Sequence, residues 1–299
     1  MEFTYSIIIP HYNSPELLAR MLKSIPERDD IQVIVVDDCS RTEEVECLKK
    51  LQHKNLELYL QTENHGAGYA RNVGLEHATG KWVLVVDADD RFTEGAFDIL
   101  DKYKDEVLDY LCYRIQIIDS EGNPQKNNCS EDSVEAYLSD ANKKNTNLFK
   151  YRNLVCWNKM VSMNFIRKYN IRFEECQVNN DVLYNLMIGL YAQSYKVIPD
   201  ILYNPIGQPD SIVRKKRNVQ REYQFFIQAQ KRNGFYKRLG LSHWPYYRHT
   251  VLYIPHMLRK HGVVFTIQFF WFCLVHLQDI KSARRAYLPL FEVHKGQVS

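Results

Sequence analysis

The tetrapeptide Asp87-Ala88-Asp89-Asp90 places three carboxylates within four residues, directly after the apolar run 82–86. Acidic side chains at the end of a buried strand require a neutralising cation, because unpaired charges are costly to bury. Carboxylate oxygens are hard ligands that suit Mg²⁺ or Mn²⁺, and these ions usually bind a substrate phosphate as well. The cluster therefore indicates a site for a metal ion and a diphosphate. The alternative is an acidic turn in which Asp90 caps a helix beginning near Thr93.

Two further polar segments follow apolar runs earlier in the chain. Pro10-His11-Tyr12-Asn13 follows the run 6–9, and Asp37-Asp38 follows the run 31–36. Continuous apolar runs of this length are typical of strands buried on both faces of a parallel sheet. Because ligands of such sheets collect beyond the carboxyl ends of the strands, we expect the three polar segments to converge on one edge.

Helices are predicted between these strands, so that strands and helices alternate as in a parallel α/β sheet. Ser14-Pro15-Glu16 is a typical helix start, with a polar N-cap residue, a proline in the first turn and an early acid. The strands predicted in the first hundred residues are 6–10, 31–36, 56–60 and 81–86, and the helices are 15–25, 42–51, 66–77 and 93–103.

The rest of the chain is divided by changes in composition. We predict a strand over 107–118, an irregular connection over the polar stretch 126–147, a helix over 181–192 and a strand over 196–201. The basic run 214–217 marks the expected end of an α/β domain that covers 1–215. The remainder, 216–299, is predicted to be a helical, aromatic-rich C-terminal extension.

Bulk composition narrows the class of protein. The net charge of +3 is too small to indicate nucleic-acid binding. The seven cysteines are odd in number and include no CxxC pair, which argues against a disulfide framework and against structural zinc. The N-terminus is acidic and runs directly into a strand without a signal peptide, so we predict a cytoplasmic location.

The chain resembles inverting glycosyltransferases of family 2, which have a GT-A fold, a Rossmann-like and mostly parallel sheet flanked by helices. The order and spacing of the matching segments agree over roughly the first ninety residues, and weaker matches extend to about residue 215. The resemblance implies a donor-binding half over about 1–105 and an acceptor half over about 106–215. The strong matches are Ser6-Ile-Ile-Ile-Pro-His-Tyr-Asn13, Val35-Val-Asp-Asp-Cys-Ser40, Asn64-His-Gly-Ala-Gly-Tyr-Ala-Arg-Asn-Val-Gly74 and Val85-Val-Asp-Ala-Asp-Asp90.

For the donor, the resemblance implies a UDP-sugar held at the ends of the first strands. Asp38 would accept a hydrogen bond from the uracil, and Pro10 and Tyr12 would form the wall of the base pocket. Asp87 would lie near the ribose, and Asp89 would bind a Mn²⁺ or Mg²⁺ ion that bridges both phosphates.

The resemblance also places Gly66, Arg71 and Asn72 toward the nucleotide-sugar. A structural salt bridge from Arg71 to Asp87 is the alternative, and both can hold at once. For Asp37 two roles stay open: a contact with the ligand, or a hydrogen bond that stabilises its own turn. Cys39 stands where the family commonly has glycine, which predicts a turn without positive φ.

An inverting transfer needs a general base, and in the family this is the aspartate of a Glu-Asp pair that opens a helix. The matching pair is Asn180-Asp181, so the resemblance makes Asp181 the catalytic base. Asn180 lacks the negative charge of the family's glutamate, which predicts a lower pKa for Asp181. Two alternatives follow: Asp181 is only an acid favoured by a helix N-terminus, or the chain binds nucleotide-sugars without efficient catalysis.

The acceptor is expected to be a glycan or a lipid-linked glycan. Trp157, Asn158 and Lys159 are candidates for the wall of the acceptor or sugar pocket, although a tryptophan packs equally well in a core.

The C-terminal stretch 263–277 is apolar, rich in aromatic residues and flanked by basic residues. It is about fifteen residues long, which is short of the ~20 that span a bilayer. Three interpretations remain open: packing within the protein, a homodimer interface, or an anchor in the membrane surface at the inner face of the plasma membrane.

Overall fold

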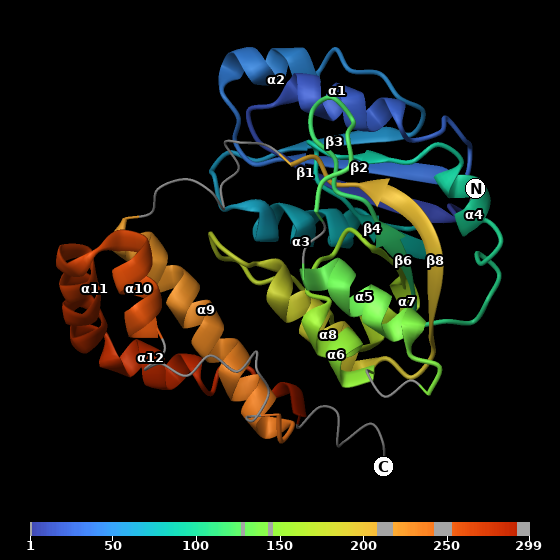
Figure 1. The fold of residues 1–299 in the computed structure, drawn as a ribbon. Coiled ribbons are helices and arrows are strands. Elements are labelled where there is room, and N and C mark those ends of the chain that lie inside the picture. Colours follow the sequence, from blue (N-terminus) through green and yellow to red (C-terminus); the bar gives the residue numbers. More distant parts are fainter. Residues whose placement is uncertain (1, 127–128, 143–145, 208–217, 242–252, 292–299) are drawn as a thin grey trace. The chain divides into compact units, whose positions relative to one another are not determined.

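The computed structural model describes residues 2–126, 129–142, 146–207, 218–241 and 253–291, and the chain divides into two compact units, Met1–Ser211 and Ile212–Ser299. The first unit is built on an eight-stranded sheet with the strand order β3-β2-β1-β4-β7-β6-β8-β5 (Figure 1). Its strands are β1 (Tyr5–His11), β2 (Ile31–Asp37), β3 (Leu56–Leu60), β4 (Trp82–Val85), β5 (Arg91–Phe92), β6 (Tyr110–Ile115), β7 (Lys159–Ser162) and β8 (Tyr195–Asn204).

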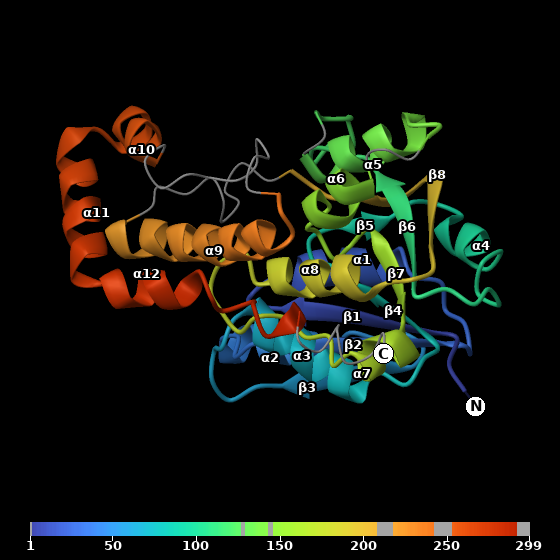
Figure 2. The same cartoon turned by 90° about the horizontal axis from the view of Figure 1, so that it is seen from below.

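The helices of this unit connect the strands and cover both faces of the sheet. Strands β3, β2, β1 and β4 are parallel to one another, with α1 and α2 on one face and α3 on the other (Figures 1 and 2). The helices are α1 (Pro15–Lys23), α2 (Thr42–Leu48), α3 (Ala67–His77), α4 (Ala96–Leu100), α5 (Cys129–Ser139), α6 (Thr146–Arg152), α7 (Met163–Lys168) and α8 (Asp181–Tyr191).

The order of the parallel strands reverses beside β1. The chain runs from β1 outward to β2 and β3 and then crosses to β4 on the other side of β1. In open α/β sheets ligands bind at such a reversal of strand order, beyond the carboxyl ends of the strands, so this edge is where a ligand is expected. The predicted alternation of strands and helices is confirmed for this half.

The second half of the sheet is mixed. Strand β7 pairs antiparallel with both β4 and β6, whereas β6 and β8 are parallel. The two-residue strand β5 pairs antiparallel with β8, so that Arg91–Phe92 belongs to the sheet and α4 begins only at Ala96. The helix predicted over 93–103 is therefore shorter than expected.

The expectation of an irregular connection over 126–147 is wrong for the part that forms α5 and the start of α6. Val134 and Phe149 are buried on these helices, and the rings of Tyr137 and Phe149 lie 4.7 Å apart. A few apolar side chains at helical spacing thus form a packed face that the polar composition conceals, because tertiary contacts override weak local propensity.

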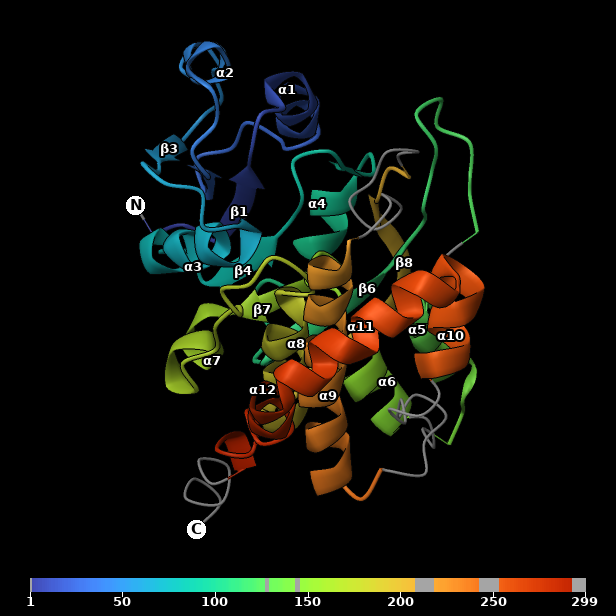
Figure 3. The same ribbon diagram turned by 90° about the vertical axis from the view of Figure 1, so that its left-hand side faces the viewer.

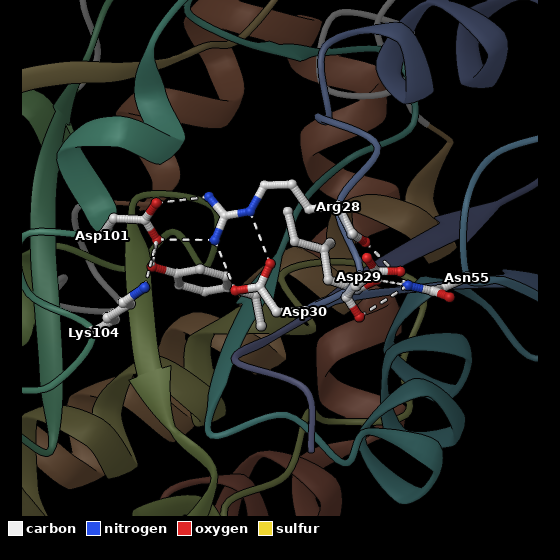
Figure 4. Close-up of polar contacts among 8 residues, drawn as sticks. Arg28, Asp29, Asp30, Asn55, Asp101 and Lys104 are labelled. Atoms are coloured by element: carbon white, nitrogen blue, oxygen red, sulfur yellow. Dashed lines mark hydrogen bonds and ion pairs between the residues drawn. The ribbon is translucent and has the colours of Figure 1, made fainter. Parts of the chain in front are cut away.

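A forked ion pair ties the amino-terminal edge of the sheet to α4 (Figure 4). Arg28 donates to both oxygens of Asp30 at 2.8 and 2.7 Å and to both oxygens of Asp101 at 2.7 and 3.1 Å. The hydroxyl of Tyr5 on β1 donates to Asp101 at 2.9 Å. Bidentate pairs of this kind fix geometry better than single surface ion pairs, so this network fixes the edge opposite to the predicted site.

The second unit is a bundle of four described helices, α9 (Val219–Arg238), α10 (Tyr253–His261), α11 (Val263–Val275) and α12 (Leu277–Ala283). Figure 3 shows α11 lying across α9, with α10 and α12 at its two ends. Asn218 caps α9 by accepting a hydrogen bond from the Arg221 amide at 2.8 Å. The core of this unit is aromatic and contains Tyr223, Phe226, Tyr253, Met257, Phe269, Cys273 and Ile280.

Close packing of α3 on β1 leads to a stability prediction. A Cβ atom added to Gly74 would lie 2.3 Å from Cγ2 of Ile8, in a buried layer between helix and strand. Gly74→Ala should therefore lower the free energy of unfolding by about 1–3 kcal/mol, even though alanine is favoured over glycine in a helix. Urea denaturation of the two proteins measures the difference.

Gly207→Ala is the matched control, because its added Cβ would meet nothing closer than 3.5 Å and the backbone there is not left-handed. It should change the free energy of unfolding by less than about 0.5 kcal/mol. Equal stability of the two variants would contradict the close packing of α3 on β1.

Candidate active site

Polar residues from three parallel strands meet at the carboxyl edge of the sheet. His11 at the end of β1 is in register with Asp37 at the end of β2, and Ile8 is in register with Val85 on β4. The segment after β4 continues this alignment, because the Val86 amide donates to the Ile8 carbonyl at 3.0 Å. The predicted convergence of the three polar segments is therefore confirmed.

His11 and Asp37 form a buried network that closes the loops after β1 and β2. His11 Nε2 accepts a hydrogen bond from the Ser14 amide, so its proton lies on Nδ1 and is donated to Asp37 at 2.8 Å. Ser40 donates its hydroxyl at 2.5 Å and its amide at 2.9 Å to the same carboxylate. Burial acts to raise the pKa of Asp37, but the hydrogen bonds from His11 and Ser40 outweigh it and hold the pKa below its ordinary value.

The turn beside this network corrects one expectation. Cys39 has a φ of 63°, so the prediction that this turn avoids positive φ is wrong. The thiol contacts the Thr62 carbonyl at 3.4 Å, and the closed loop holds the backbone in a conformation that glycine would adopt more easily.

Asp38 fixes the loop that precedes α3. Its two carboxylate oxygens accept the amides of His65 and Gly66 at 2.9 and 2.7 Å. Gly66, with a φ of 91°, is the residue that turns the chain into α3. Each oxygen of Asp38 keeps a second lone pair, which a hydrogen bond from uracil would use. That contact stays a prediction. Nearby, Tyr12 has 53% of its surface exposed, as an aromatic platform for a base requires.

Arg71 on α3 connects the two halves of the first unit. Its Nη2 donates to Asp87 Oδ1 at 2.6 Å, and its Nη1 donates to Asn180 Oδ1 at 2.5 Å. The guanidinium also lies 5.4 Å from the ring centroid of Phe173. The salt bridge that was the alternative role of Arg71 is therefore present. Its buried Nε has no partner among the described residues, which leaves one donor for a ligand.

Asn72 fastens α3 to the loop before α8. Its side chain donates to the Phe173 carbonyl at 3.0 Å and accepts from the Phe173 amide at 2.9 Å. It also donates to Glu175 at 3.1 Å. With so many contacts to protein, Asn72 holds the 173–175 loop, and its contact with the donor stays a prediction.

The acid cluster contains three aspartates with different surroundings. Asp87 is paired with Arg71, whereas Asp89 accepts no hydrogen bond from another side chain in the described part of the chain. Burial and the charge of Asp87 raise the pKa of Asp89 to about 6, although Arg20 acts in the opposite direction. An uncompensated carboxylate beside a second carboxylate is the arrangement that favours a bound cation.

Asp90 has a positioning role that the sequence did not indicate. Its oxygens accept the Ile206 amide at 2.8 Å and the Tyr203 hydroxyl at 3.0 Å. The same hydroxyl accepts the Asp87 amide at 3.0 Å. The interpretation of Asp90 as a helix cap near Thr93 is wrong, because buried Asp90 instead joins the acid cluster to β8. Burial and its acidic neighbours Asp87 and Asp89 raise the pKa of Asp90 well above its ordinary value.

Asp181 is the first residue of α8 and belongs to the same charged cluster. Burial raises the pKa of Asp181 to about 6; the charge of Arg71 lowers it and that of Asp87 raises it. Desolvation is the largest cause of this shift. The expectation that Asn180 gives Asp181 a lower pKa than a glutamate would stays a prediction. A carboxylate with a pKa near 6 can act as a base at neutral pH.

The candidates at 157–159 are engaged with the protein. Trp157 is nearly buried and stacks on Tyr203, with ring centroids 5.8 Å apart. Lys159 donates to the carbonyls of Asn153 and Val155 at 3.2 and 2.6 Å and to Asn158 Oδ1 at 3.0 Å, which uses all three donors of an ammonium group. Burial lowers the pKa of Lys159 to about 8. A role of these residues in the acceptor pocket stays a prediction.

Two residues of the site were not predicted to contact the acid cluster. Arg20 on α1 donates to the Asp89 carbonyl at 2.8 Å, and Tyr203 on β8 bridges Asp87 and Asp90. Both lie far from the acid cluster in sequence, and only the folded sheet brings them to it.

The bridging hydroxyl leads to a prediction for Tyr203→Phe. The variant leaves the buried carboxylate of Asp90 and the Asp87 amide each without one partner, so the free energy of unfolding should fall by about 1–3 kcal/mol. Tyr169→Phe is the control, because the ring of Tyr169 stacks on Tyr191 while no hydrogen bond of its hydroxyl is present in the described part of the chain. Chemical denaturation measures both, and equal stability would contradict the bridge.

Comparison with known proteins agrees with this geometry. The model of glycosyl transferase family 2 matches residues 6–169. Poly(ribitol-phosphate) beta-N-acetylglucosaminyltransferase TarS of Staphylococcus aureus is 34% identical over 128 residues, which cover 40% of this chain and 22% of TarS. Minor teichoic acid biosynthesis protein GgaB of Bacillus subtilis is 28% identical over 214 residues, 68% of this chain and 23% of GgaB. The chain thus spans less than a quarter of these relatives.

Solved structures show the same fold. The crystal structure of residues 1–349 of S. aureus TarS with UDP-GlcNAc superposes with a TM-score of 0.61 at 22% identity, covering 77% of this chain and 66% of that one. The mannosyltransferase PcManGT of Pyrobaculum calidifontis, solved with GDP-Man and Mn²⁺, gives a TM-score of 0.55 at 14% identity over 98% of this chain and 87% of that one. The family model covers more than half of the sequence, and the sheet is that of the GT-A fold. This chain belongs to glycosyltransferase family 2.

Proposed function

We propose that this chain is an inverting glycosyltransferase that moves a sugar from a UDP-sugar to a hydroxyl of a glycan or lipid-linked glycan. One observation carries the proposal. Arg71 binds both Asp87, at the end of β4, and Asn180, which directly precedes Asp181. A carboxylate able to act as a base therefore lies in the same cluster as the carboxylates that would hold the donor.

The donor end of the site supports a nucleoside diphosphate. Tyr12 is exposed and Pro10 is half-buried, so both would be able to contact a base, and Asp38 follows the end of the adjacent strand. TarS binds UDP-GlcNAc and PcManGT binds GDP-Man, so the shared fold does not select the base. TarS is also the closer in sequence of these two, which favours UDP for this chain.

The acid cluster fits a divalent cation that is shared with the substrate. No group of three or more His, Cys, Asp or Glu side chains in the described residues is arranged to enclose a metal ion. Mg²⁺ and Mn²⁺ in nucleotide sites commonly take only one or two protein carboxylates and complete their shell with phosphate and water. Asp89, which has a raised pKa and accepts no side-chain hydrogen bond from the described residues, would be that ligand, with Asp87 beside it. When bound, the ion would offset the charge that develops on the departing UDP.

The proposed reaction is a single displacement. Asp181 takes the proton of the acceptor hydroxyl while that oxygen attacks the anomeric carbon of the donor sugar. The bond from this carbon to the diphosphate breaks on the opposite face, so UDP leaves with the bonding electrons and the configuration inverts. Arg71 positions Asp87 and the Asn180 segment, and its charge favours the ionised form of Asp181.

A catalytically impaired nucleotide-sugar-binding protein is the second candidate, favoured by Asn180 in place of the family's glutamate. Asn180 nevertheless accepts a hydrogen bond from Arg71, as a glutamate could. Release of UDP upon addition of acceptors distinguishes the two functions, because a binding protein releases none.

Asp89→Ala should remove the part of UDP binding that depends on Mn²⁺. The substitution deletes the carboxylate that would hold the ion, while the contacts to the base remain. Titration calorimetry of UDP with Mn²⁺ and with a chelator measures this part. Asp98→Ala, which removes an exposed aspartate on α4, is the control and should bind as the wild type does. Unchanged Mn²⁺-dependent affinity in Asp89→Ala would exclude the metal assignment.

Asp181→Asn should leave UDP affinity within about twofold of the wild type and lower the transfer rate by ~10²-fold or more, because the amide cannot accept the proton. Coupled detection of released UDP at saturating donor measures the rate. Transfer at a near-normal rate would remove Asp181 from the mechanism.

The pH dependence of transfer provides an independent measurement. Since the base must be ionised and burial raises the pKa of Asp181 in the free enzyme to about 6, kcat/KM should be constant above that pH and fall about tenfold per unit below it. Asn180→Glu places a like charge beside Asp181 and should move this acid limb to higher pH. An acid limb that does not move would show that the titrating group is not Asp181.

A further inference from the structure

Exposed apolar side chains are concentrated on one segment of the second unit. Of the thirteen large hydrophobic residues that are exposed in the described chain, nine lie between residues 254 and 277. Single exposed apolar residues are common on protein surfaces, but a contiguous set usually marks a contact site. The set consists of Ile254, Leu258, Val263, Val264, Ile267, Trp271, Leu274, Val275 and Leu277, and we refer to it as the α10–α11 patch.

Most of the patch occupies one face of α11. At about 100° per residue, its positions from Val263 to Val275 fall within roughly a third of the helix circumference. The opposite side of the helix carries Thr266, Phe269 and Cys273, which are buried, and Phe269 and Cys273 belong to the same core cluster as Tyr223 and Phe226 of α9. Helix α11 is therefore apolar on its exposed face as well as on its core face, which a helix facing water alone would not be.

Helix α11 is short compared with the thickness of a bilayer. No single helix in the described residues is long and apolar enough to cross a bilayer, and α11 and α12 together reach that composition only across a bend of 76°. Thirteen residues of helix extend about 20 Å, against ~30 Å of hydrocarbon. A helix of this length is suited to lie in the plane of the interface, where Trp271 and its neighbours would enter the acyl region.

The net positive charge of the second unit is complementary to an anionic surface. Residues 1–211 contain 23 Lys and Arg against 33 Asp and Glu, a net charge of −10, whereas residues 212–299 contain 16 against 3, a net charge of +13. Exposed cations flank the patch on both sides in sequence: Arg259 and Lys260 precede α11, and Lys281, Arg284 and Arg285 follow it. A second copy of this unit would be repelled by these like charges, whereas anionic lipid headgroups would be attracted.

We propose that the α10–α11 patch inserts into the surface of a membrane that contains anionic lipid. Apolar side chains of α11 enter the boundary between headgroups and acyl chains, and the flanking Lys and Arg side chains contact the anionic headgroups. This inference goes beyond the proposed function and does not depend on it, because no catalytic residue takes part. It would bring the enzyme to the surface where a lipid-linked acceptor resides.

Flotation of the full chain with vesicles tests the proposal. The wild type should bind vesicles with 30% phosphatidylglycerol at least ~10-fold more tightly than vesicles of phosphatidylcholine alone, and 0.5 M NaCl should weaken the binding without abolishing it. Ile267→Glu/Leu274→Glu should lower binding ~10-fold or more. Both positions are exposed, so circular dichroism should show an unchanged fold.

Leu60→Glu/Val107→Glu is the matched control, since it replaces two exposed apolar residues of the first unit by the same charges. It should bind vesicles as the wild type does. Emission of Trp271, isolated as the difference between the wild type and Trp271→Phe, should shift to shorter wavelength on binding. Asp89→Ala should also bind vesicles normally, so that loss of transfer and loss of membrane binding are distinguishable.

Three results would overturn the proposal. The first is that the wild type does not bind anionic vesicles. The second is that Ile267→Glu/Leu274→Glu binds these vesicles as tightly as Leu60→Glu/Val107→Glu does. The third is that light scattering without lipid shows a wild-type dimer that Ile267→Glu/Leu274→Glu dissociates, which would assign the patch to a second copy of the chain.

Discussion

The guanidinium of Arg71 is the charged group that ties the end of β4 to the start of α8. It extends from α3 to Asp87, at the end of β4, and to Asn180, immediately before α8. Glycines allow this reach, since a Cβ on Gly68 would lie 2.1 Å from the Glu174 carbonyl and prevent α3 from approaching the loop before α8. Asn72 adds further hydrogen bonds to the same loop. The carboxylates of the site are thus held from two parts of the chain more than ninety positions apart.

The site around the Arg71 guanidinium contains more carboxylates than the charge of Arg71 neutralises. Burial raises the pKa of Asp89 and of Asp181 to about 6 and that of Asp90 well above its ordinary value. Of the three, Asp90 is bound on both oxygens by protein donors, whereas Asp89 has no such partner among the described residues. The cost of leaving Asp89 charged is the physical reason why this position would select a cation together with its phosphate ligands.

Strands β1, β2 and β4 were predicted because each is a largely apolar run, and α1 because Ser14-Pro15-Glu16 is a local start signal. Strand β3 was predicted with its observed limits, Leu56–Leu60, and the polar ends of β1, β2 and β4 were expected at one edge. Strand β7 was missed because its four residues are too few to show alternation. Helices α5 and α6 were missed because only a few of their side chains are buried, which gives no distinct helical periodicity. Tyr203 could not be predicted as the partner of Asp87 and Asp90, because that contact joins positions separated by more than a hundred residues.

The uneven distribution of charge has a consequence for how the protein behaves in solution. The isoelectric point near 8.3 describes neither residues 1–211 nor residues 212–299, because these two parts have net charges of opposite sign. At low ionic strength the acidic part of one molecule attracts the basic part of another, and this attraction extends about 30 Å in 0.01 M salt but only about 10 Å in 0.1 M. Solubility should therefore increase as salt is added, and the chain should be retained by cation and anion exchangers alike.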